Sequence, residues 1–234
     1  MRAETQYLAV DPVAVPRYLE QTYWWAYVHP RAVKLFEREW LVNMILWGNF
    51  GRLRDAALDA LGDRLDGRTL QIACVYGDLT RRLAARVTNG GRLDVLDVLP
   101  IQLENLARKL PQKVPVELVH GDSAGLPFES ASYDRALLFF LLHEQPDEAR
   151  RRTIAEALRV VKPGGRLVIV DYHRPGAFNP LYWPMVGILR TLEPFALDLW
   201  KHEIREWFPK TLEISSLQKK ISFGGLYQLL TVTL

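Results

Sequence analysis

Apolar residues in the middle of the chain form short continuous runs that alternate with segments of helical pattern. The runs cover residues 69–75, 93–98, 116–120, 133–140 and 166–171. Helical patterns open after Asp78, which we expect to cap the helix, and span about 100–110 and 147–161. Residues 162–165 predict a tight turn into the last run. Short buried strands alternating with helices predict a doubly wound, mostly parallel α/β sheet.

The two ends of the chain differ from this middle part in their aromatic content. All seven tryptophans lie outside residues 51–182. Residues 16–60 predict two or three helices, and residues 178–208 predict short helices broken by prolines. Residues 212–233 alternate as two antiparallel strands do, which brings the expected sheet to seven strands.

Composition narrows the class of protein. Apolar residues make up 49% of the chain, as in ordinary folded proteins. A single cysteine excludes a disulfide framework and fits a reducing cytoplasm. The net charge of +3 does not favour nucleic-acid binding. We find neither a signal peptide nor an apolar stretch near the roughly 20 residues that span a bilayer.

Polar residues follow the predicted strands at their carboxyl ends. Ligands of open parallel sheets bind at this edge, near the point where the strand order reverses. The edge collects Tyr76-Gly77, Asp97, Gly121-Asp122, His143-Glu144 and Asp171-Tyr172-His173.

Three motifs give residues 69–171 a resemblance to class I S-adenosylmethionine-dependent methyltransferases. They are Gly77-Asp78-Leu79-Thr80, Gly121-Asp122-Ser123-Ala124-Gly125-Leu126-Pro127-Phe128 and Leu158-Arg159-Val160-Val161-Lys162-Pro163-Gly164-Gly165. The resemblance is greatest to enzymes that C-methylate ubiquinone and menaquinone precursors. It implies that Asp97 accepts hydrogen bonds from the cofactor's ribose hydroxyls and Asp122 from its adenine amino group, with Val98 and Ser123 beside them.

The first motif of this family is altered in the chain. Gln71 stands where family members carry an acid, and the glycine positions read Ala73, Val75 and Gly77. A β-branched valine resists positive φ and fills space near the methionine part of the cofactor. The domain has either lost its cofactor or binds it in a changed pose; the retained aspartates favour the changed pose.

The whole chain resembles the rhodoquinone-biosynthesis methyltransferase-like enzymes. The resemblance rests on Tyr23-Trp24-Trp25-Ala26-Tyr27-Val28-His29-Pro30, Leu41-Val42-Asn43-Met44-Ile45-Leu46-Trp47-Gly48-Asn49-Phe50 and Val75-Tyr76-Gly77-Asp78-Leu79-Thr80. It implies that S-adenosylmethionine donates an amino group that replaces a methoxy group of ubiquinone, assisted by Mn(II). Ordinary C- or O-methylation of a prenylated quinone precursor, or quinone binding without catalysis, remain alternatives.

Candidate residues for this chemistry follow from their types and places. We expect catalytic roles for Tyr76, His143 and His29; Tyr76 would orient the amine or a quinone oxygen, or pack on the ring. Because manganese prefers oxygen ligands with some imidazole, its candidate ligands are His143, His173 and Asp171.

The tryptophan-rich ends suit a prenylated substrate. Tryptophan and tyrosine combine an apolar body with a polar group, as at membrane interfaces. We expect a quinone-facing helical cap over residues 1–66 and a Rossmann-like cofactor domain over 67–234 with a lid at 175–208. The expected protein is cytoplasmic and associates peripherally with the membrane; its oligomeric state stays open.

Overall fold

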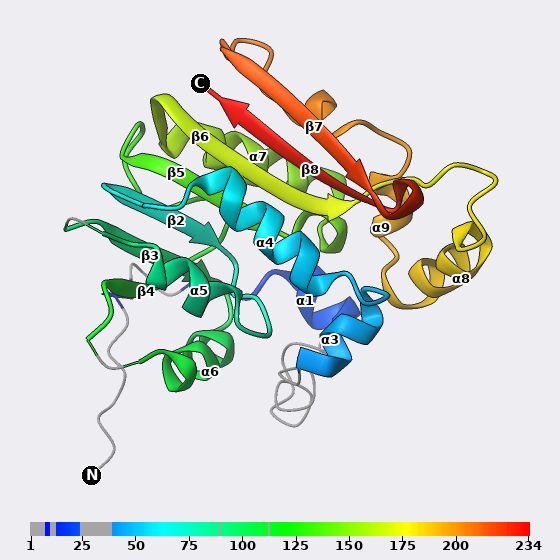
Figure 1. Ribbon diagram of the computed structural model, residues 1–234, viewed down its shortest axis with the longest axis horizontal. Helices are drawn as coiled ribbons and strands as arrows, with labels where there is room; N and C mark the ends of the chain where they lie inside the picture. Colours follow the sequence, from blue (N-terminus) through cyan, green and yellow to red (C-terminus); the bar gives the residue numbers. More distant parts are fainter. Residues whose placement is uncertain (1–7, 10–12, 24–38, 89, 112) are drawn as a thin grey trace.

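A computed structural model describes residues 8–9, 13–23, 39–88, 90–111 and 113–234 (Figure 1). Its centre is one sheet with strand order β1-β4-β3-β2-β5-β6-β8-β7. The strands are β1 (Leu8–Ala9), β2 (Arg68–Ile72), β3 (Arg92–Asp97), β4 (Val116–His120), β5 (Tyr133–Phe139), β6 (Val161–Tyr172), β7 (Ser216–Ser222) and β8 (Tyr227–Thr233). The expected seven-stranded, mostly parallel sheet is confirmed, and the two-residue β1 adds a short edge strand to it.

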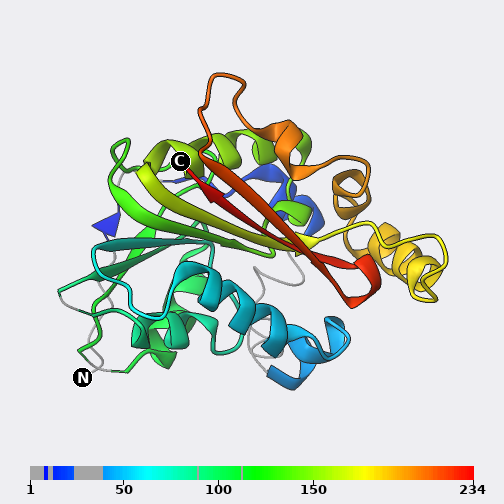
Figure 2. The ribbon, with the colours of Figure 1, turned by 45° about the horizontal axis from the view of Figure 1, so that its top comes forward.

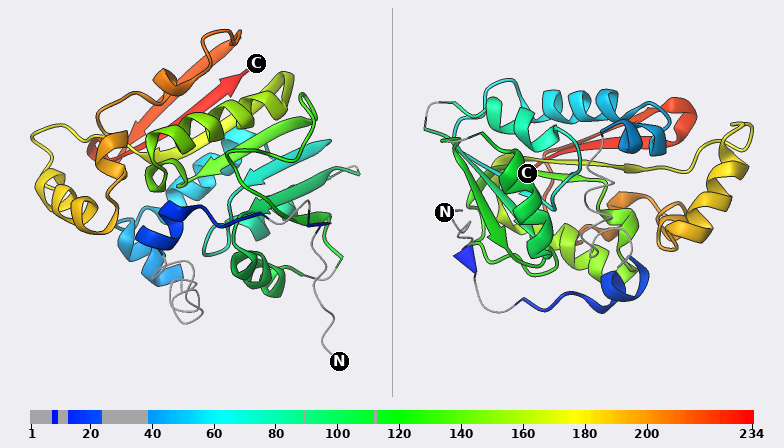
Figure 3. Two further views of the ribbon diagram at one scale, coloured as in Figure 1. Left: turned by 180° about the vertical axis from the view of Figure 1, so that it is seen from behind. Right: turned by 90° about the horizontal axis from the view of Figure 1, so that it is seen from below.

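Helices cover both faces of the sheet. They are α1 (Arg17–Thr22), α3 (Glu39–Ile45), α4 (Phe50–Leu61), α5 (Leu79–Ala85), α6 (Pro100–Lys109), α7 (Asp147–Val160), α8 (Tyr182–Leu192) and α9 (Ala196–Leu199), with short 3₁₀ turns η2 (Leu142–Glu144), η3 (Ile204–Trp207) and η4 (Phe223–Gly225). Figure 1 shows α4 and α5 in front of the sheet. The left view of Figure 3, which is seen from behind, shows α7 on the opposite face of the sheet.

The alternation of side chains along the strands builds one core on each face. Leu137 of β5 packs into the core that includes α4, α5 and α6, whereas the next residue, Leu138, packs into the core that includes α7. Successive strand residues point to opposite faces, so continuous apolar runs serve both layers at once.

The strand order reverses at β2. This strand pairs in parallel with β3 on one side and β5 on the other, while β8 is antiparallel to both of its neighbours. The crevice beyond the carboxyl ends of β2 and β5 is therefore the expected place for a ligand.

Three local predictions need correction. The strand predicted over 69–75 ends at Ile72, because Ala73 takes a left-handed backbone with φ of 73°. The turn predicted at 162–165 lies within β6 as an irregularity, with Gly164 at φ of 75°. Asp78 stands at the start of α5 without capping it; its carboxylate instead pairs with Arg54 and Arg82.

The regions outside the middle part contain the expected helices. The lid segment carries α8, α9 and η3, and α4 packs on the sheet itself. No helix among the described residues is both long and apolar enough to cross a membrane. The division into a cap at 1–66 and a cofactor domain at 67–234 stays a prediction.

Candidate functional site

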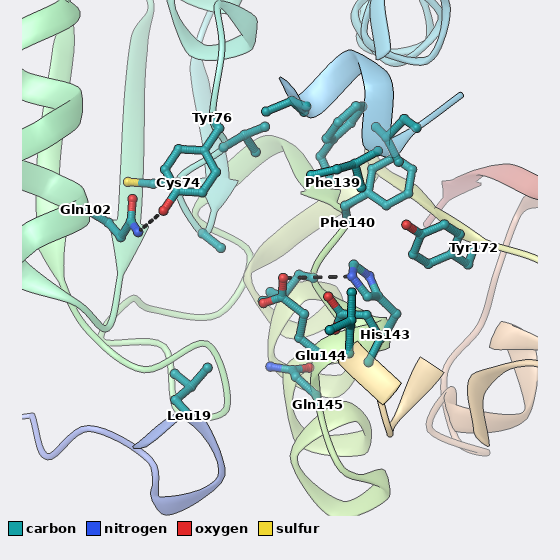
Figure 4. Close-up of a pocket in the computed structure, with 18 of the residues that line it drawn as sticks. Leu19, Cys74, Tyr76, Gln102, Phe139, Phe140, His143, Glu144, Gln145 and Tyr172 are labelled. Carbon is teal, nitrogen blue, oxygen red and sulfur yellow. Dashed lines mark hydrogen bonds and ion pairs between the residues drawn. The ribbon is translucent and has the colours of Figure 1, made fainter. Parts of the chain in front are cut away.

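A cavity of about 540 Å³ lies beyond the carboxyl ends of the central strands. The loops after β2, β3, β4 and β5 form its floor, and residues of α1, α3, η2 and α8 form its walls. Figure 4 shows Cys74, Tyr76 and Gln102 on one side and His143 and Glu144 on the other. The cavity therefore lies where the strand order predicts a ligand.

Asp97 closes β3 and forms part of the cavity lining. Its two carboxylate oxygens accept the backbone N–H groups of Cys74, at 2.7 Å, and Leu99, at 2.8 Å. Burial raises the pKa of Asp97 to about 6, although these hydrogen bonds and the nearby His120 act in the opposite direction. The side chain of Cys74 also bonds this carboxylate, which still retains acceptor capacity for a ligand's hydroxyl group.

Asp122 and Ser123 lie beside it in the loop after β4. Oδ1 of Asp122 accepts the N–H of Ala124 at 2.8 Å, and Val98 joins the two residues in the lining. Ser123 Oγ accepts a hydrogen bond from Gln145 Nε2 at 3.0 Å. The structure thus brings Asp97, Val98, Asp122 and Ser123 to one side of the cavity, as a site for the adenosine half of S-adenosylmethionine requires.

The altered first motif forms the loop after β2. Gln71 is buried outside the cavity lining; its Nε2 donates to the Ala73 carbonyl and its Oε1 accepts from the Thr80 hydroxyl. Its side chain is neutral and already hydrogen-bonded, so it holds no charge for a ligand's ammonium group. The left-handed backbone falls on Ala73, whereas Val75 has negative φ. The expected backbone strain therefore lies two residues earlier than the valine.

Val75 and Tyr76 contribute their side chains to the cavity lining. The Tyr76 hydroxyl accepts a hydrogen bond from Gln102 Nε2 at 2.8 Å, as Figure 4 shows. Gly77 does not line the cavity; a Cβ there would lie 2.9 Å from Phe50 Cζ. Glycine at 77 thus allows α4 to pack closely on this loop, while Val75 and Tyr76 shape the cavity.

His143 lies in η2, across the cavity from this loop (Figure 4). Its Nδ1 lies 2.9 Å from Asp171 Oδ1, and its Nε2 lies 3.8 Å from Glu144 Oε1. Burial alone would lower the pKa of His143, but Asp171, Glu193 and Glu144 together raise it to about 9. At neutral pH the ring is therefore a cation whose Nε2–H is available to a ligand in the cavity.

Glu193 follows α8 and lines the same side of the cavity. Its carboxylate is buried beside the hydroxyl of Tyr23, with which it shares a hydrogen bond. Burial raises the pKa of Glu193, while His143 acts to lower it. The sequence pattern does not predict a role for Glu193. The one feature that marks it is that it is the first acidic residue after the twenty-one residues 172–192, which contain no Asp or Glu.

The predicted manganese ligands do not form a ligand set. Asp171 is fully buried and its oxygens accept N–H groups from Leu142, His143 and Tyr172 in addition to contacting the His143 ring. His173 Nδ1 is 2.7 Å from the Gly225 carbonyl oxygen, and its side chain is not part of the cavity lining. Among the described residues no three potential metal-binding side chains cluster. The donor set at these positions does not fit a manganese ion.

One further candidate lies outside the described residues. His29 falls in the segment 24–38, so its place relative to the cavity is not described. Tyr18 of α1, which the sequence analysis did not single out, lines the cavity near Gln145 and Asp122.

Known proteins are similar to this chain in sequence and in fold. Residues 69–165 match the family described as methyltransferase domain. A demethylmenaquinone methyltransferase of Beutenbergia cavernae is 31% identical over 200 residues, which cover 80% of this chain and 78% of that protein. One of Bacillus licheniformis is 27% identical over 200 residues, covering 81% and 85%.

A solved structure supports the same fold. The N-methyltransferase NodS from Bradyrhizobium japonicum, in complex with S-adenosyl-L-homocysteine, matches this chain with a TM-score of 0.59 and 14% sequence identity. The match covers 86% of this chain and 96% of that protein. The fold match, the family match over residues 69–165 and the 31% identical relative, which covers 80% of this chain, all indicate a methyltransferase. The chain belongs to the class I S-adenosylmethionine-dependent methyltransferase family.

Proposed function

We propose that the protein uses S-adenosylmethionine to modify the head group of a prenylated quinone, and that it replaces a ring methoxy group of ubiquinone by an amino group. The adenosine half of the cofactor would be held by Asp97 and Asp122. The cap at 1–66 and the lid at 175–208 would select the substrate. The relatives named as demethylmenaquinone methyltransferases support the quinone class.

One observation carries the choice of amino transfer. The part of the loop after β2 that lines the cavity, residues 73–76, has no carboxylate. Gln71 in β2 is neutral and is hydrogen-bonded to Ala73 and Thr80, while Val75 and Tyr76 line the cavity. A carboxylate would favour the ammonium form of the cofactor's amino group, and only the neutral amine is a nucleophile. In this reaction S-adenosylmethionine supplies the nitrogen that enters the quinone ring.

His143 would activate the quinone. The ring carbon that bears the methoxy group is conjugated to a carbonyl group and is therefore electrophilic. A hydrogen bond from the Nε2–H of the His143 cation to that carbonyl oxygen stabilises the negative charge that develops there. Asp171 holds the ring through Nδ1 at 2.9 Å and keeps it charged.

Glu193 would handle the protons. The entering nitrogen loses a proton, and the departing methoxy group gains one to leave as methanol. The bond from that nitrogen to the methionine α-carbon must also break: loss of the α-proton with transfer of two electrons to the quinone ring, followed by addition of water, would release the methionine part as a 2-oxo acid and leave the amino group on the reduced ring. Glu193 is buried at the cavity beside Tyr23, and the raised pKa of its carboxyl suits a group that takes up and returns a proton. Tyr76, held by Gln102, would fix the orientation of the ring.

Methyl transfer to a quinone precursor is the second candidate. It is favoured by the similarity of about four fifths of this chain to demethylmenaquinone methyltransferases. The same cavity would then place a nucleophilic ring carbon or hydroxyl group toward the methyl group of the cofactor.

Mass spectrometry of the quinone separates the two reactions. The purified protein is incubated in one assay with ubiquinone and in a second with a demethylated quinone precursor. Both assays contain S-adenosylmethionine labelled with ¹⁵N at the amino group and are run with and without Mn(II). A product in which a labelled amino group replaces methoxy supports amino transfer. A demethylated precursor that gains a methyl group supports the second candidate. An unchanged quinone in both assays would contradict both reactions.

A matched variant tests the observation behind the choice. Gln71→Glu restores an acid at the altered position, and we expect it to lower amino transfer while cofactor binding is retained. Gln71→Met also removes the Nε2–H group that donates to the Ala73 carbonyl but adds no charge, so it serves as the control. Equal loss in both variants would show that the neutral charge of Gln71 is not the reason.

A further inference from the structure

The exposed large apolar side chains of the described residues gather in three segments. The segments are residues 40–47 of α3 and the following turn, residues 178–192 leading through α8, and residues 221–223 at the tip of the β7–β8 hairpin. Met44 is 60% exposed and Trp183 is 74% exposed. We call these three segments the apolar rim. Since large exposed apolar patches mark interaction sites, this grouping calls for a partner.

The three segments lie at one end of the molecule. Figure 2 shows α3, α8 and the hairpin tip together at the end away from β1 and β4. Trp47 Nε1 lies 3.2 Å from the sulfur of Met185, which joins the first segment to α8. Asn179 Nδ2 donates to the Gly224 carbonyl at 2.8 Å, which joins the second segment to the hairpin tip. The rim is therefore one continuous surface.

The rim surrounds the mouth of the cavity. Met44, Ile45, Trp47, Ile188 and Leu192 line the cavity and are also exposed. Residues that do both mark the place where the cavity opens to the surface. A molecule that enters the cavity there must pass between apolar side chains of α3 and α8.

The stretches of chain that carry the rim contain basic residues but no acidic ones between the flanking acids Glu39, Asp55, Glu193 and Glu213. Residues 40–54, 172–192 and 214–226 contain no Asp or Glu. They carry four exposed cations, none of which forms an ion pair with a described residue: Arg52, Arg174, Arg190 and Lys220. Apolar side chains with surrounding Lys and Arg are the composition of surfaces that rest on anionic bilayers.

We propose that the apolar rim docks on the surface of an anionic phospholipid bilayer and presents the cavity mouth to it. Trp183 and its neighbours would enter the boundary between head groups and acyl chains, while the four cations attract anionic head groups. The purpose of this docking, delivery of a prenylated quinone, rests on the proposed function. The docking itself is inferred from the exposed apolar side chains and the cations, independently of the proposed function.

Vesicle flotation tests the surface without quinone or cofactor. The full chain is mixed with vesicles of phosphatidylcholine alone or with added phosphatidylglycerol. We expect binding to the anionic vesicles that weakens with salt. The double variant Phe178→Ser and Trp183→Ser should lose about tenfold or more in partitioning. Both side chains are exposed, so the melting temperature should stay unchanged.

Charge variants supply the matched comparison. Arg174→Gln with Arg190→Gln should weaken binding to anionic vesicles only, whereas Arg151→Gln, on the exposed face of α7 behind the sheet, should not. Equal binding of the wild type and the Phe178/Trp183 variant would overturn the proposal. Dimers in lipid-free solution that the same variant abolishes would instead assign the rim to a second copy.

A failure of the proposed function is distinguishable from a failure of the docking. If ubiquinone is unchanged in the mass-spectrometric assay but the vesicle result stands, the bilayer surface remains and the reaction is wrong. If the reaction stands and vesicles do not bind, the docking proposal alone fails.

Discussion

Two buried carboxylates near the carboxyl ends of strands, Asp97 on β3 and Asp171 on β6, have opposite electrostatic surroundings. Both accept backbone N–H groups from nearby in the chain and from the segment after a neighbouring strand. Asp97 accepts from Leu99 and Cys74, and Asp171 accepts from Tyr172 and Leu142. Asp97 lines the cavity without a cation in hydrogen-bond contact, and burial raises its pKa to about 6. Asp171 lies against the His143 ring and raises the pKa of that ring to about 9.

The difference in surroundings indicates that Asp97 is suited to binding a ligand and Asp171 to positioning the His143 ring. A carboxylate without a paired cation has hydrogen-bonding capacity left for a ligand. A carboxylate paired with a histidine uses its hydrogen-bonding capacity to hold the imidazole ring in place. The same residue type at the same edge of the sheet therefore serves two purposes, and the neighbouring loop decides which.

The largest expected effect is on cofactor affinity. Asp97→Ala removes the acceptor for two ligand hydroxyl groups, and hydrogen bonds to charged groups are worth about 1.5–3 kcal/mol each. We expect the dissociation constant for S-adenosylmethionine to rise at least roughly hundredfold in calorimetric titration. Because Cys74 and Leu99 also lose a partner, circular dichroism must show that the variant is folded. Normal affinity in a folded variant would refute the assignment of Asp97.

The second expected effect is on stability and its pH dependence. A histidine whose pKa is raised from 6.5 to about 9 on folding contributes about 3 kcal/mol below pH 6.5. That contribution is lost as the pH rises through about 9. Asp171→Asn should lower the free energy of unfolding at pH 6 by a similar amount and flatten its dependence between pH 6.5 and 9.

Urea unfolding at several pH values measures this effect. His120→Gln is the control, because His120 bonds the Val98 carbonyl and has no carboxylate in hydrogen-bond contact. If Asp171→Asn keeps the wild-type slope between pH 6.5 and 9, the pairing does not hold the charge on His143.

The third expected effect is on the pH dependence of cofactor binding. Burial raises the pKa of Asp97 to about 6, and ligand hydroxyl groups bond the ionised form more strongly. Affinity for S-adenosylmethionine should therefore fall as the pH falls below 6, by about tenfold per pH unit at most. Titration calorimetry from pH 7.5 to 5 checks this. A constant affinity over that range would mean that protonation of Asp97 does not control binding.

The smallest expected effect concerns Tyr76. Tyr76→Phe removes the hydroxyl that accepts from Gln102 but keeps the ring in the cavity. One neutral hydrogen bond is worth about 1 kcal/mol, so turnover should fall roughly fivefold with little change in cofactor affinity. Gln102→Leu should give a similar loss in the same assay. A loss of cofactor affinity instead would place Tyr76 at the cofactor rather than at the quinone.

The periodicity of the sequence accounts for most of the fold. The runs at 116–120 and 133–140 predict β4 and β5 closely, because buried parallel strands require continuous apolar residues whatever their neighbours are. Errors fall where backbone geometry rather than hydrophobicity decides, as at Ala73 and in the irregular start of β6. Left-handed backbone at alanine leaves no mark in the apolar pattern.

The site was only partly predictable, for a related reason. Asp97 and Asp122 sit directly at strand ends, so their place follows from the order of the elements alone. The pairing of His143 with Asp171 spans 28 residues, and the approach of Glu193 to the same cavity depends on how the lid folds back.

The sequence by itself determined the alternating sheet, the position of two aspartates at strand ends and the change in the first motif. Each of these depends on residues close in the chain. Only the tertiary structure decided that Asp171 holds a histidine instead of contributing to a metal site, and that three distant apolar segments surround one cavity mouth. Charge state and exposure depend on neighbours that packing brings together, and periodicity carries no record of them.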